Sequence, residues 1–232
     1  GHRERYDLSS LRTITYGTEP MPQTTLLGVR QVLPQVRCKQ TYGMTEVGIL
    51  PTRSEANDSL WLELGGPGFE VRVIDGILWI RAETSMLGYL NAPSPFDAAG
   101  WLNTGDLVES RDGALRILGR QSEVINVGGE KVSPVEIEDV ILQVDNIEEV
   151  VVRHKSSPIT GHIVVATVRT LCDEDHRSVA ARVRRHCQQQ LSPFKVPALI
   201  QVTQADLMGR RFKKLRQVDA LATSDAQVAS VV

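Results

Sequence analysis

The stretch Trp101–Glu138, WLNTGDLVESRDGALRILGRQSEVINVGGEKVSPVEIE, decides how this chain is divided. Its first half places strand-like segments on both sides of Arg111-Asp112-Gly113, and Asp-Gly readily takes the positive φ angles of a tight hairpin turn. Its second half ends in Ser133-Pro134-Val135-Glu136, which supplies an N-cap, a proline at the first helical position and a glutamate three residues after the cap. The stretch therefore predicts a seam between two domains, and its acids, bases and glycines mark that seam as an active-site candidate.

Short strands and one helix are expected ahead of this stretch. Leu11–Tyr16 predicts a short buried strand that breaks before the loop TEPMP, and a helix follows through Leu26 and Val32. The segment CKQTYGMTEVG is best placed as a strand that runs into a turn at Gly43. A further hairpin is expected at Asp75-Gly76, between VRVI and ILWI. The first part of the chain is therefore expected to end as a β-rich subdomain.

The later part of the chain is expected to alternate strands with helices. Apolar residues recur at helical spacing after Ser133-Pro134, and a second helix is expected over about 178–191. Strands are predicted at Val150–Arg153, Ile163–Arg169 and Leu199–Thr203. The expected division is a β-rich part over 1–120, a small α+β domain over 121–220 and a frayed tail over 221–232.

Composition excludes several classes of function. The 232 residues carry a formal net charge of -2, so nothing in the overall charge indicates nucleic acid as the main partner. No apolar run approaches the roughly 20 residues that cross a bilayer, and the start GHRERYDLSS lacks the apolar core of a signal peptide, so a cytoplasmic protein without a membrane span is expected. Cys38, Cys172 and Cys187 are far apart and in no metal-ligand spacing, and are interpreted as ordinary thiols.

Two charged residues of the seam suggest a ligand. Asp106 follows Gly105, and Arg120 follows Gly119 close to the expected domain boundary. A carboxylate is a natural acceptor for two adjacent sugar hydroxyls, as in dinucleotide folds, so a ribose between Asp106 and Arg120 is one interpretation. The alternative is a surface aspartate and an exposed arginine that pair with each other or contact nothing.

Four motifs occur in a fixed order along the chain: TYGMTE at 41–46, NTGD at 103–106, GRQSEVINVGGEKVSPVEIE at 119–138 and RRFKKLR at 210–216. With them the chain resembles the adenylate-forming superfamily of acyl-CoA synthetases, peptide-synthetase adenylation domains and luciferases, over nearly its whole length. The resemblance implies an α/β and α+β fold. Residues 1–120 would be the C-terminal, β-rich part of the large AMP-binding domain, and 121–220 a small mobile lid.

The resemblance implies a two-step ligase reaction. A carboxylate attacks the α-phosphate of ATP to give an acyl-adenylate and pyrophosphate, and a thiol of CoA or of a carrier protein's phosphopantetheine then displaces AMP. Catalysis of the first step depends on positioning and on stabilising negative charge, so the site should contain cations, metal ligands and nucleoside clamps. The implied partners are a carboxylic acid, CoA or an acyl carrier protein, and ATP with Mg²⁺.

Site residues follow from the motifs position by position. The resemblance implies that Tyr42 stacks on adenine, that Thr45 contacts the α-phosphate and that Glu46 holds Mg²⁺, which prefers oxygen ligands and shares them with phosphates. Core packing of Tyr42 and an exposed turn at Glu46 are the alternatives if TYGMTE is taken alone. The remaining implied nucleotide contacts are the adenine-edge loop Gly17, Thr18 and Glu19 and the ribose pair Asp106 and Arg120.

The catalytic lysine of the family usually lies in a Gly-Lys-x-x-Arg setting near the C-terminus. This chain keeps the Lys-x-x-Arg spacing but has Phe212 in place of the glycine. The resemblance points to Lys213, with Lys214 as the alternative. A solvated basic face that includes Arg216 would explain the same cluster of charges without catalysis.

Two further positions concern the motion between the steps. Ser122 stands where relatives usually have the Asp or Lys of the domain hinge, and a hinge needs only to absorb a backbone dihedral change. Gly128 and Gly129 would line the pantetheine tunnel in the thiol step, because glycine permits close approach and unusual φ angles. They would suit a simple β-turn equally well.

One motif of the family is missing. Relatives bind the outer phosphates with a Ser/Thr/Gly-rich loop that ends in Pro-Lys, whereas the run Gly65-Gly66-Pro67-Gly68 is better placed as the turn before a hairpin. The chain is therefore expected to be the C-terminal portion of a ligase, inactive without an N-terminal half from the same gene or a split chain. The alternative is a non-catalytic module that binds a nucleotide, CoA or a carrier protein.

Overall fold

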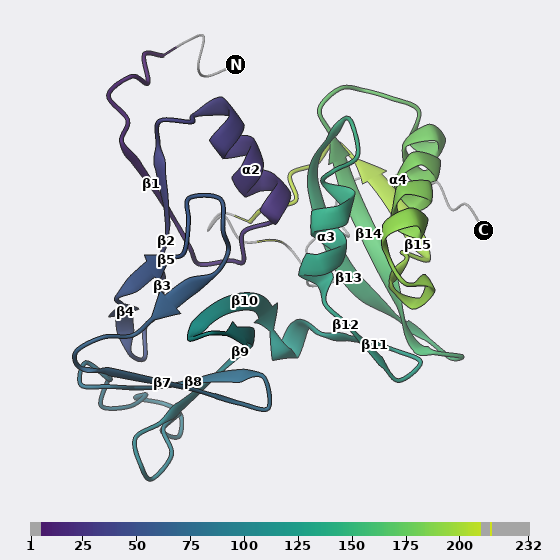
Figure 1. Cartoon of the computed structure of the whole chain (residues 1–232). Coiled ribbons are helices and arrows are strands. Elements are labelled where there is room, and N and C mark those ends of the chain that lie inside the picture. The colour runs from purple at the N-terminus through teal and green to yellow at the C-terminus, as the bar shows by residue number, and fades with distance from the viewer. Residues whose placement is uncertain (1–5, 210–213, 215–232) are drawn as a thin grey trace. The chain divides into compact units, whose positions relative to one another are not determined.

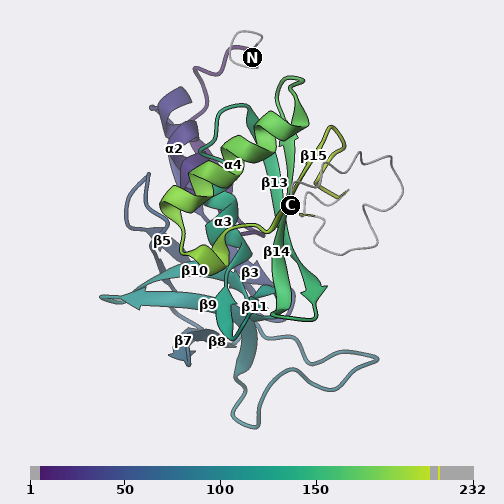
Figure 2. The ribbon, with the colours of Figure 1, turned by 90° about the vertical axis from the view of Figure 1, so that its right-hand side faces the viewer.

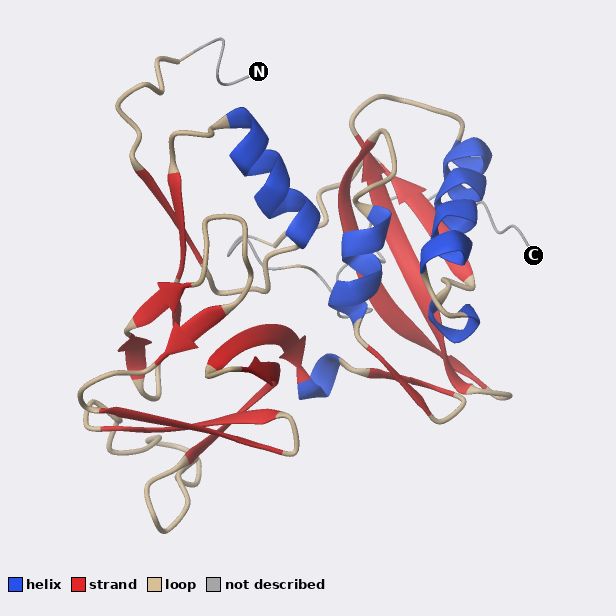
Figure 3. Cartoon of the chain, in the orientation of Figure 1, coloured by secondary structure: helices blue, strands red, loops and turns tan. Residues whose placement is uncertain are grey.

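The computed structural model describes residues 6–209 and 214 (Figure 1). The chain divides into two compact units, residues 1–121 and 122–232. No helix of the described residues is long and apolar enough to cross a membrane. Strands outnumber helices in this mixed α/β fold, as the sequence predicts (Figure 3).

The first unit is built on a six-stranded antiparallel sheet. Its strands follow the order β5-β6-β10-β9-β8-β7. Both predicted Asp-Gly hairpins are confirmed: Asp75 and Gly76 have φ angles of 51° and 75°, and Asp112 and Gly113 have φ angles of 50° and 83°. The bounds are β5 Thr52–Ser54, β6 Leu62–Leu64, β7 Phe69–Ile74, β8 Ile77–Ala82, β9 Leu102–Arg111 and β10 Ala114–Arg120.

Strand β9 buries every second side chain. Leu102, Thr104, Asp106 and Val108 are buried, and the residues between them are exposed or half-buried. This period of two places the polar Thr104 and Asp106 in the same row as the apolar residues of the core. The carboxylate of the predicted ribose site therefore lies on the inner face of the strand.

Two small sheets and a helix complete the first unit. β1 (Thr13–Tyr16) pairs in parallel with β2 (Arg37–Gln40), α2 (Gln23–Val32) connects them, and β3 (Tyr42–Met44) pairs with β4 (Gly48–Leu50). The predicted strand at β1 and the helix through Leu26 are confirmed, but the expectation that β1 is buried is wrong. Within the described residues β1 pairs with β2 alone, so its residues alternate between exposed and half-buried.

The turn expected at Gly43 lies elsewhere. Gly43 is inside β3, and residues 45–47 form the turn. A Cβ atom on Gly43 would lie 2.7 Å from the carbonyl oxygen of Gly48 and 2.8 Å from Cα of Ile49. The glycine is needed because two backbones approach closely, and a glycine with that role is indistinguishable from a turn glycine in the sequence. The run Gly65–Gly68, in contrast, is the predicted turn before β7.

The second unit is a five-stranded sheet with helices. The short 3-10 helix η1 (Gln121–Glu123) precedes it, and the sheet follows the order β12-β11-β14-β13, with β15 parallel to β14. The last strand coincides with its prediction, and β13 and β14 are longer than predicted. The bounds are β11 Ile125–Val127, β12 Glu130–Val132, α3 Pro134–Ile141, β13 Ile147–Ser157, β14 Gly161–Thr170, α4 His176–Gln190, η2 Pro193–Lys195 and β15 Leu199–Thr203.

Both helices cover one side of this sheet (Figure 2). Ile137 and Ile141 of α3 and Val183 of α4 join the same core as the alternate residues of β13 and β14. Helix α3 begins at Pro134 as predicted, although the side chain of Ser133 makes no capping hydrogen bond to α3. The segment that follows β15 runs along the other side of the sheet, where Leu207 is fully buried.

Candidate functional site

Asp106 is the centre of a polar cluster in the first unit. Asp106 is only 6% exposed. Its Oδ2 accepts a hydrogen bond from the Tyr42 hydroxyl, and its Oδ1 lies 2.8 Å from Nε of Arg120, which donates to it. Asp106 and Arg120 are direct register partners across β9 and β10. Sheet register therefore brings Asp106 and Arg120 together, and a hydrogen bond adds Tyr42 from the separate sheet of β3 and β4.

Arg120 is fixed on one side and open on the other. Its Nη1 donates to the carbonyl of Thr104 at 2.9 Å, and the hydroxyl of Thr104 donates to the carbonyl of Leu78 at 2.8 Å. The side chain of Arg120 nevertheless keeps 50% of its surface exposed. Its guanidinium can therefore hold Asp106 and still meet a ligand from solvent.

Burial dominates the electrostatics of the cluster. The low-dielectric surroundings raise the pKa of Asp106, and the Tyr42 hydrogen bond and the Arg120 charge oppose this shift. The pKa of Tyr42 is raised in turn, first by burial and then by the charge of Asp106. Tyr42 therefore stays protonated at neutral pH and donates its proton to the carboxylate.

This geometry separates the two interpretations of Asp106. A surface aspartate is excluded, because Asp106 lies in the buried row of β9, although it does form the ion pair with Arg120 that the alternative interpretation contained. A hydrogen-bonded buried carboxylate can accept further hydroxyl donors, since it has about four acceptor positions. The carboxylate thus keeps acceptor positions that Tyr42 and Arg120 do not use.

The loop Gly17, Thr18 and Glu19 lies beside the chain segment that leads to Tyr42. The backbone N–H of Thr41 donates to the carbonyl of Tyr16 at 2.7 Å, and a Cβ on Gly17 would come within 2.6 Å of the Thr41 carbonyl oxygen. Thr18 adopts a φ of 70°, which is uncommon for a residue with a side chain. Two segments of the predicted nucleotide site are therefore neighbours in space.

The turn that carries Thr45 and Glu46 is held by a later loop. The N–H of Met86 donates to the carbonyl of Glu46 at 2.8 Å, and the Tyr89 hydroxyl donates to the Glu46 carboxylate. This hydrogen bond is the main cause of the raised pKa of Tyr89. Sequence reasoning missed Tyr89, because 43 residues separate it from Glu46 and no local pattern signals the pairing.

Glu46 is a single carboxylate rather than part of a ligand cage. Within the described ranges, 6–209 and 214, no group of three or more His, Cys, Asp or Glu side chains could hold a metal ion. Magnesium usually binds through one or two carboxylates, waters and the phosphates of a substrate. A single carboxylate such as Glu46 is compatible with this mode of binding, in which the nucleotide supplies most of the other ligands.

The predicted residues of the second unit lie at its start and in one hairpin. Ser122 is exposed in η1. Gly128 and Gly129 form the turn between β11 and β12 with φ angles of 59° and 95°, so a hairpin requires both glycines whatever else they do. Lys213 lies outside the described residues. Lys214 is described, and its Nζ lies 2.6 Å from the carboxylate of Glu138.

The three cysteines are free thiols, as predicted. Cys38 and Cys187 are buried and Cys172 is exposed. Burial raises the pKa of the Cys187 thiol to about 11, which keeps it protonated and unreactive at neutral pH.

Two family models match separate parts of the chain. The model described as AMP-binding enzyme matches residues 1–90, and the AMP-binding enzyme C-terminal domain matches residues 136–213. The first of these includes Tyr42 and Glu46, and the second includes Glu138 and Lys213. Together the two matched ranges lie one in each structural unit, in the order of the units along the chain.

Curated relatives are CoA ligases. Acyl-CoA synthetase 7 of Caenorhabditis elegans is 29% identical over 245 residues, which cover 98% of this chain and 45% of the relative. A 4-coumarate–CoA ligase, CCL1 of Humulus lupulus, is 31% identical over 188 residues, which cover 71% of this chain and 34% of the relative. The chain thus spans less than half the length of these relatives.

Solved structures share the fold. The anthranilate CoA ligase AuaEII, in complex with anthranoyl-AMP, superposes with a TM-score of 0.78 at 24% identity, over 90% of this chain and 44% of that one. ATP-bound MatB from Rhodopseudomonas palustris superposes with a TM-score of 0.70 at 24% identity, over 84% of this chain and 42% of that one.

Proposed function

The chain belongs to the adenylate-forming family of acyl-CoA synthetases and CoA ligases, and on this premise we propose that it is the C-terminal portion of an acid–thiol ligase. Such a ligase joins a carboxylic acid to AMP at the expense of ATP and then transfers the acyl group to a thiol. The observation that carries the proposal is the buried Asp106, paired in register with Arg120 and bonded to Tyr42. Apolar residues can often replace a buried ion pair without loss of stability. The cluster therefore supports a role in binding a ligand rather than in packing.

The first unit would hold the nucleotide. Asp106 and Arg120 hold the ribose hydroxyls in the proposed site. The Tyr42 ring stacks on the adenine while the Tyr42 hydroxyl keeps its hydrogen bond to Asp106. The loop Gly17, Thr18 and Glu19, next to the Tyr42 segment, would meet the adenine edge. Support comes from their proximity, since all of these residues lie in one unit.

The turn after β3 would face the phosphates. Thr45 is exposed there and would donate to the α-phosphate, and Glu46 would hold magnesium while Tyr89 orients its carboxylate. The ion, when bound, neutralises charge on the phosphates. Lys213 would add a positive charge at the α-phosphate and the substrate carboxylate, where negative charge develops.

The second unit would serve both half-reactions. Ser122, in the 3-10 helix at the division between the units, would absorb the rotation of the small domain, and Gly128 and Gly129 would approach the thiol arm. We propose CoA as the thiol, because the curated relatives are named as CoA ligases and an acyl-CoA synthetase. A carrier-protein phosphopantetheine presents the same thiol and is the alternative acceptor.

The reaction would require residues beyond this chain. The relatives are more than twice as long, and the outer-phosphate loop of the family has no counterpart here. We therefore propose an N-terminal half as the partner that completes the site and supplies most of the acyl pocket.

A hydroxylamine-trapping screen tests the proposed function. The chain, co-expressed with an N-terminal half of the family, is supplied with ATP, magnesium and a panel of carboxylic acids, and acyl-hydroxamates report adenylate formation. At least one acid should give a hydroxamate with the wild type, and Asp106→Ala should lower its yield. A complex that assembles and binds ATP but activates no acid of a broad panel would reject the ligase proposal.

A further inference from the structure

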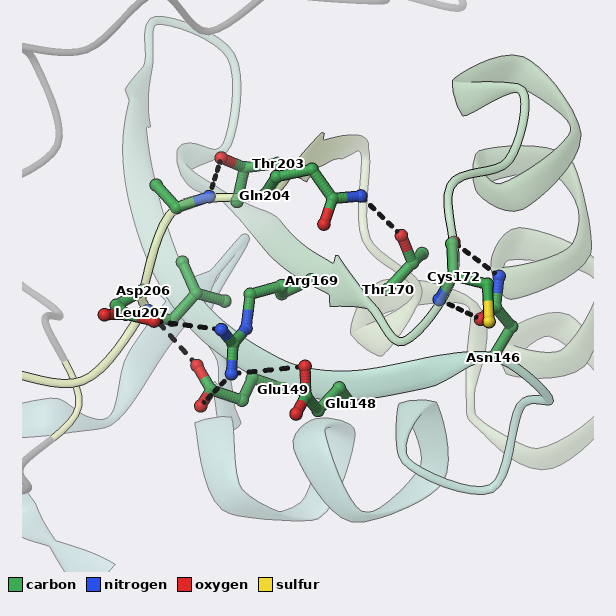
Figure 4. A network of polar contacts seen from close by, with 11 residues as sticks. Asn146, Glu148, Glu149, Arg169, Thr170, Cys172, Thr203, Gln204, Asp206 and Leu207 are labelled. Atoms are coloured by element: carbon green, nitrogen blue, oxygen red, sulfur yellow. Dashed lines mark hydrogen bonds and ion pairs between the residues drawn. The ribbon is translucent and has the colours of Figure 1, made fainter. Parts of the chain in front are cut away.

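The segment after β15 is fixed to the sheet by Arg169 of β14 (Figure 4). Nη1 of Arg169 lies 2.9 Å from the Asp206 carboxylate, and Nη2 lies 2.7 Å from the Glu149 carboxylate and 3.2 Å from that of Glu148. The other Glu149 oxygen accepts the N–H of the buried Leu207 at 3.2 Å. The chain that leads toward the basic run 210–216 is therefore attached at 206–207.

A second attachment lies at Lys214. This residue forms an isolated antiparallel β-bridge with Met208. Its Nζ lies 2.6 Å from Oε2 of Glu138, a residue of α3 that is only 1% exposed, and the Lys214 side chain is itself 15% exposed. The side chain of Lys214 is therefore largely withdrawn from solvent.

Glu138 is a demanding partner for this lysine. Its Oε1 accepts the N–H of Val152 at 2.9 Å, a backbone donor of β13, which is an end strand in the sheet order. A buried carboxylate costs free energy unless it is hydrogen-bonded and paired with a positive charge. If Lys214 left to reach a phosphate, this carboxylate would lose the ammonium group that lies 2.6 Å from it.

We infer that Lys214 and Glu138 are positioning residues, because their ion pair holds the chain at Lys214, directly after Lys213, the residue that the proposed function makes the adenylation lysine. The inference rests on the proposed function and removes the ambiguity between two lysines that the sequence leaves open. The attachments at 206–207 and 214 lie on both sides of Lys213 in the sequence, seven residues or fewer from it. Glu138 acts through Lys214 and touches no reactant.

Lysine labelling tests the attachment without any assay of activity. The native chain is trace-acetylated with a succinimidyl ester and the extent at each lysine is measured by peptide mass spectrometry. The Lys214 side chain is only 15% exposed and its Nζ is held 2.6 Å from the Glu138 carboxylate, so the reagent should reach Lys214 at least about 10-fold more slowly than the exposed Lys131. Glu138→Gln removes the charged partner and should release the side chain, so the Lys214 rate should rise to within about 3-fold of the Lys131 rate.

A matched control comes from the same helix. Glu136 pairs with Lys195 across 2.6 Å, but its carboxylate is 45% exposed. Glu136→Gln should change the labelling of Lys195 and leave that of Lys214 as it was. Rapid labelling of Lys214 in the wild type would overturn the inference, and it would do so whether or not the chain proves to be a ligase. Because this comparison uses the wild type, it stands even if Glu138→Gln does not fold.

The two half-reactions test the positioning role. In the chain completed by an N-terminal half, Lys214→Met and Glu138→Gln should each lower acid-dependent ATP–pyrophosphate exchange about 10-fold, and thiolysis of a supplied acyl-adenylate should stay within about 2-fold of the wild type. The double variant should lose less than the two single losses added together, because each single variant already removes the Lys214–Glu138 pair. Lys213→Ala should lower exchange further than Lys214→Met.

Three results contradict the inference. Equal loss of both half-reactions in Lys214→Met would show a structural role alone, unchanged exchange would show no role, and a deeper loss than in Lys213→Ala would make Lys214 the reacting lysine. Absence of exchange in the completed wild type would instead reject the proposed function, and the labelling result would still decide whether Lys214 is fixed by Glu138.

Discussion

Replacement of Asp106 by alanine tests the proposed nucleotide site at its centre. The carboxylate bonds to Tyr42 and Arg120 and is almost wholly buried, so a hydrogen bond from a ligand hydroxyl to this carboxylate would be weakly screened by solvent. A hydrogen bond to a charged group contributes about 1.5 to 3 kcal/mol. Loss of a ribose contact of this kind should therefore weaken AMP binding roughly 10- to 150-fold, at ~1.4 kcal/mol per tenfold.

The measurement is a calorimetric or fluorescence titration of the chain with AMP. Asp106→Ala should show the weaker dissociation constant, and Asp106→Asn should fall between it and the wild type, because an amide oxygen still accepts a hydroxyl without the charge. The matched control is Asp58→Asn, which changes an exposed aspartate of the same unit and should bind as the wild type does.

A second ligand separates loss of the contact from loss of the fold. 2′,3′-Dideoxy-AMP lacks both ribose hydroxyls, so the wild type should bind it more weakly than AMP, and Asp106→Ala should bind the two ligands alike. If the alanine variant still prefers AMP by the wild-type ratio, or binds AMP as tightly as the wild type does, then Asp106 does not hold the ribose and the reasoning from its burial and partners fails.

Three further predictions concern other parts of the structure. Gly17→Ala should destabilise the chain, because the added Cβ would lie 2.6 Å from a backbone oxygen of Thr41, whereas the Cβ of Gly28→Ala in α2 would meet nothing within 4 Å and should stabilise the chain by about 0.5 to 1 kcal/mol. Urea unfolding measures both changes in stability, and a stabilised Gly17→Ala would contradict the close approach. The Arg182 hydrogen bonds lower the pKa of Glu174 to about 2 from 4.5, so their contribution to the free energy of unfolding should be complete above pH 4.5 and disappear as the pH falls toward 2. Glu174→Gln should remove that part of the pH dependence of the unfolding midpoint, and an unchanged profile would refute the assignment. Tyr89→Phe removes the hydroxyl that donates to Glu46, so the magnesium concentration for half-maximal ATP binding to the completed enzyme should rise several-fold, which corresponds to about one lost hydrogen bond. Tyr6→Phe is the control and should have no effect, and an unchanged magnesium requirement in Tyr89→Phe would remove Tyr89 from this role.

Local signals account for the parts of the fold that the sequence predicts. Asp75-Gly76 and Asp112-Gly113 form tight turns because both residues of each pair accept positive φ, and Pro134 starts α3 because its fixed φ suits the first helical position. These preferences act within a few residues. They hold whatever the rest of the chain does, so a single sequence reveals them.

Contacts between distant segments account for what the sequence does not predict. Gly43 permits the close approach of Gly48 rather than a turn, and this distinction depends on the pairing of β3 with β4. The hydrogen bond from Tyr89 to Glu46 and the ion pair of Lys214 with Glu138 join residues 43 and 76 positions apart. Such pairs follow from register and packing, and no periodicity within either segment contains them.

The candidate site falls between these cases. Residue types and motif order single out Asp106 and Arg120, but their contact requires the register of β9 on β10, including the irregularity between Ile117 and Gly119. Burial of Asp106 likewise follows from its place in the alternating row of β9. The sequence thus names the participants, and the sheet brings them into contact.

Acid-dependent exchange of pyrophosphate into ATP tests the central claim most directly, that this chain is the nucleotide-holding and lid portion of an acid–thiol ligase. The chain alone should show no exchange, and the chain joined to an N-terminal half should show exchange that requires a carboxylic acid and is strongly reduced by Lys213→Ala. Robust exchange by the purified chain alone would contradict the need for a partner. Exchange in the joined protein that is indifferent to both Asp106→Ala and Lys213→Ala would contradict the site itself.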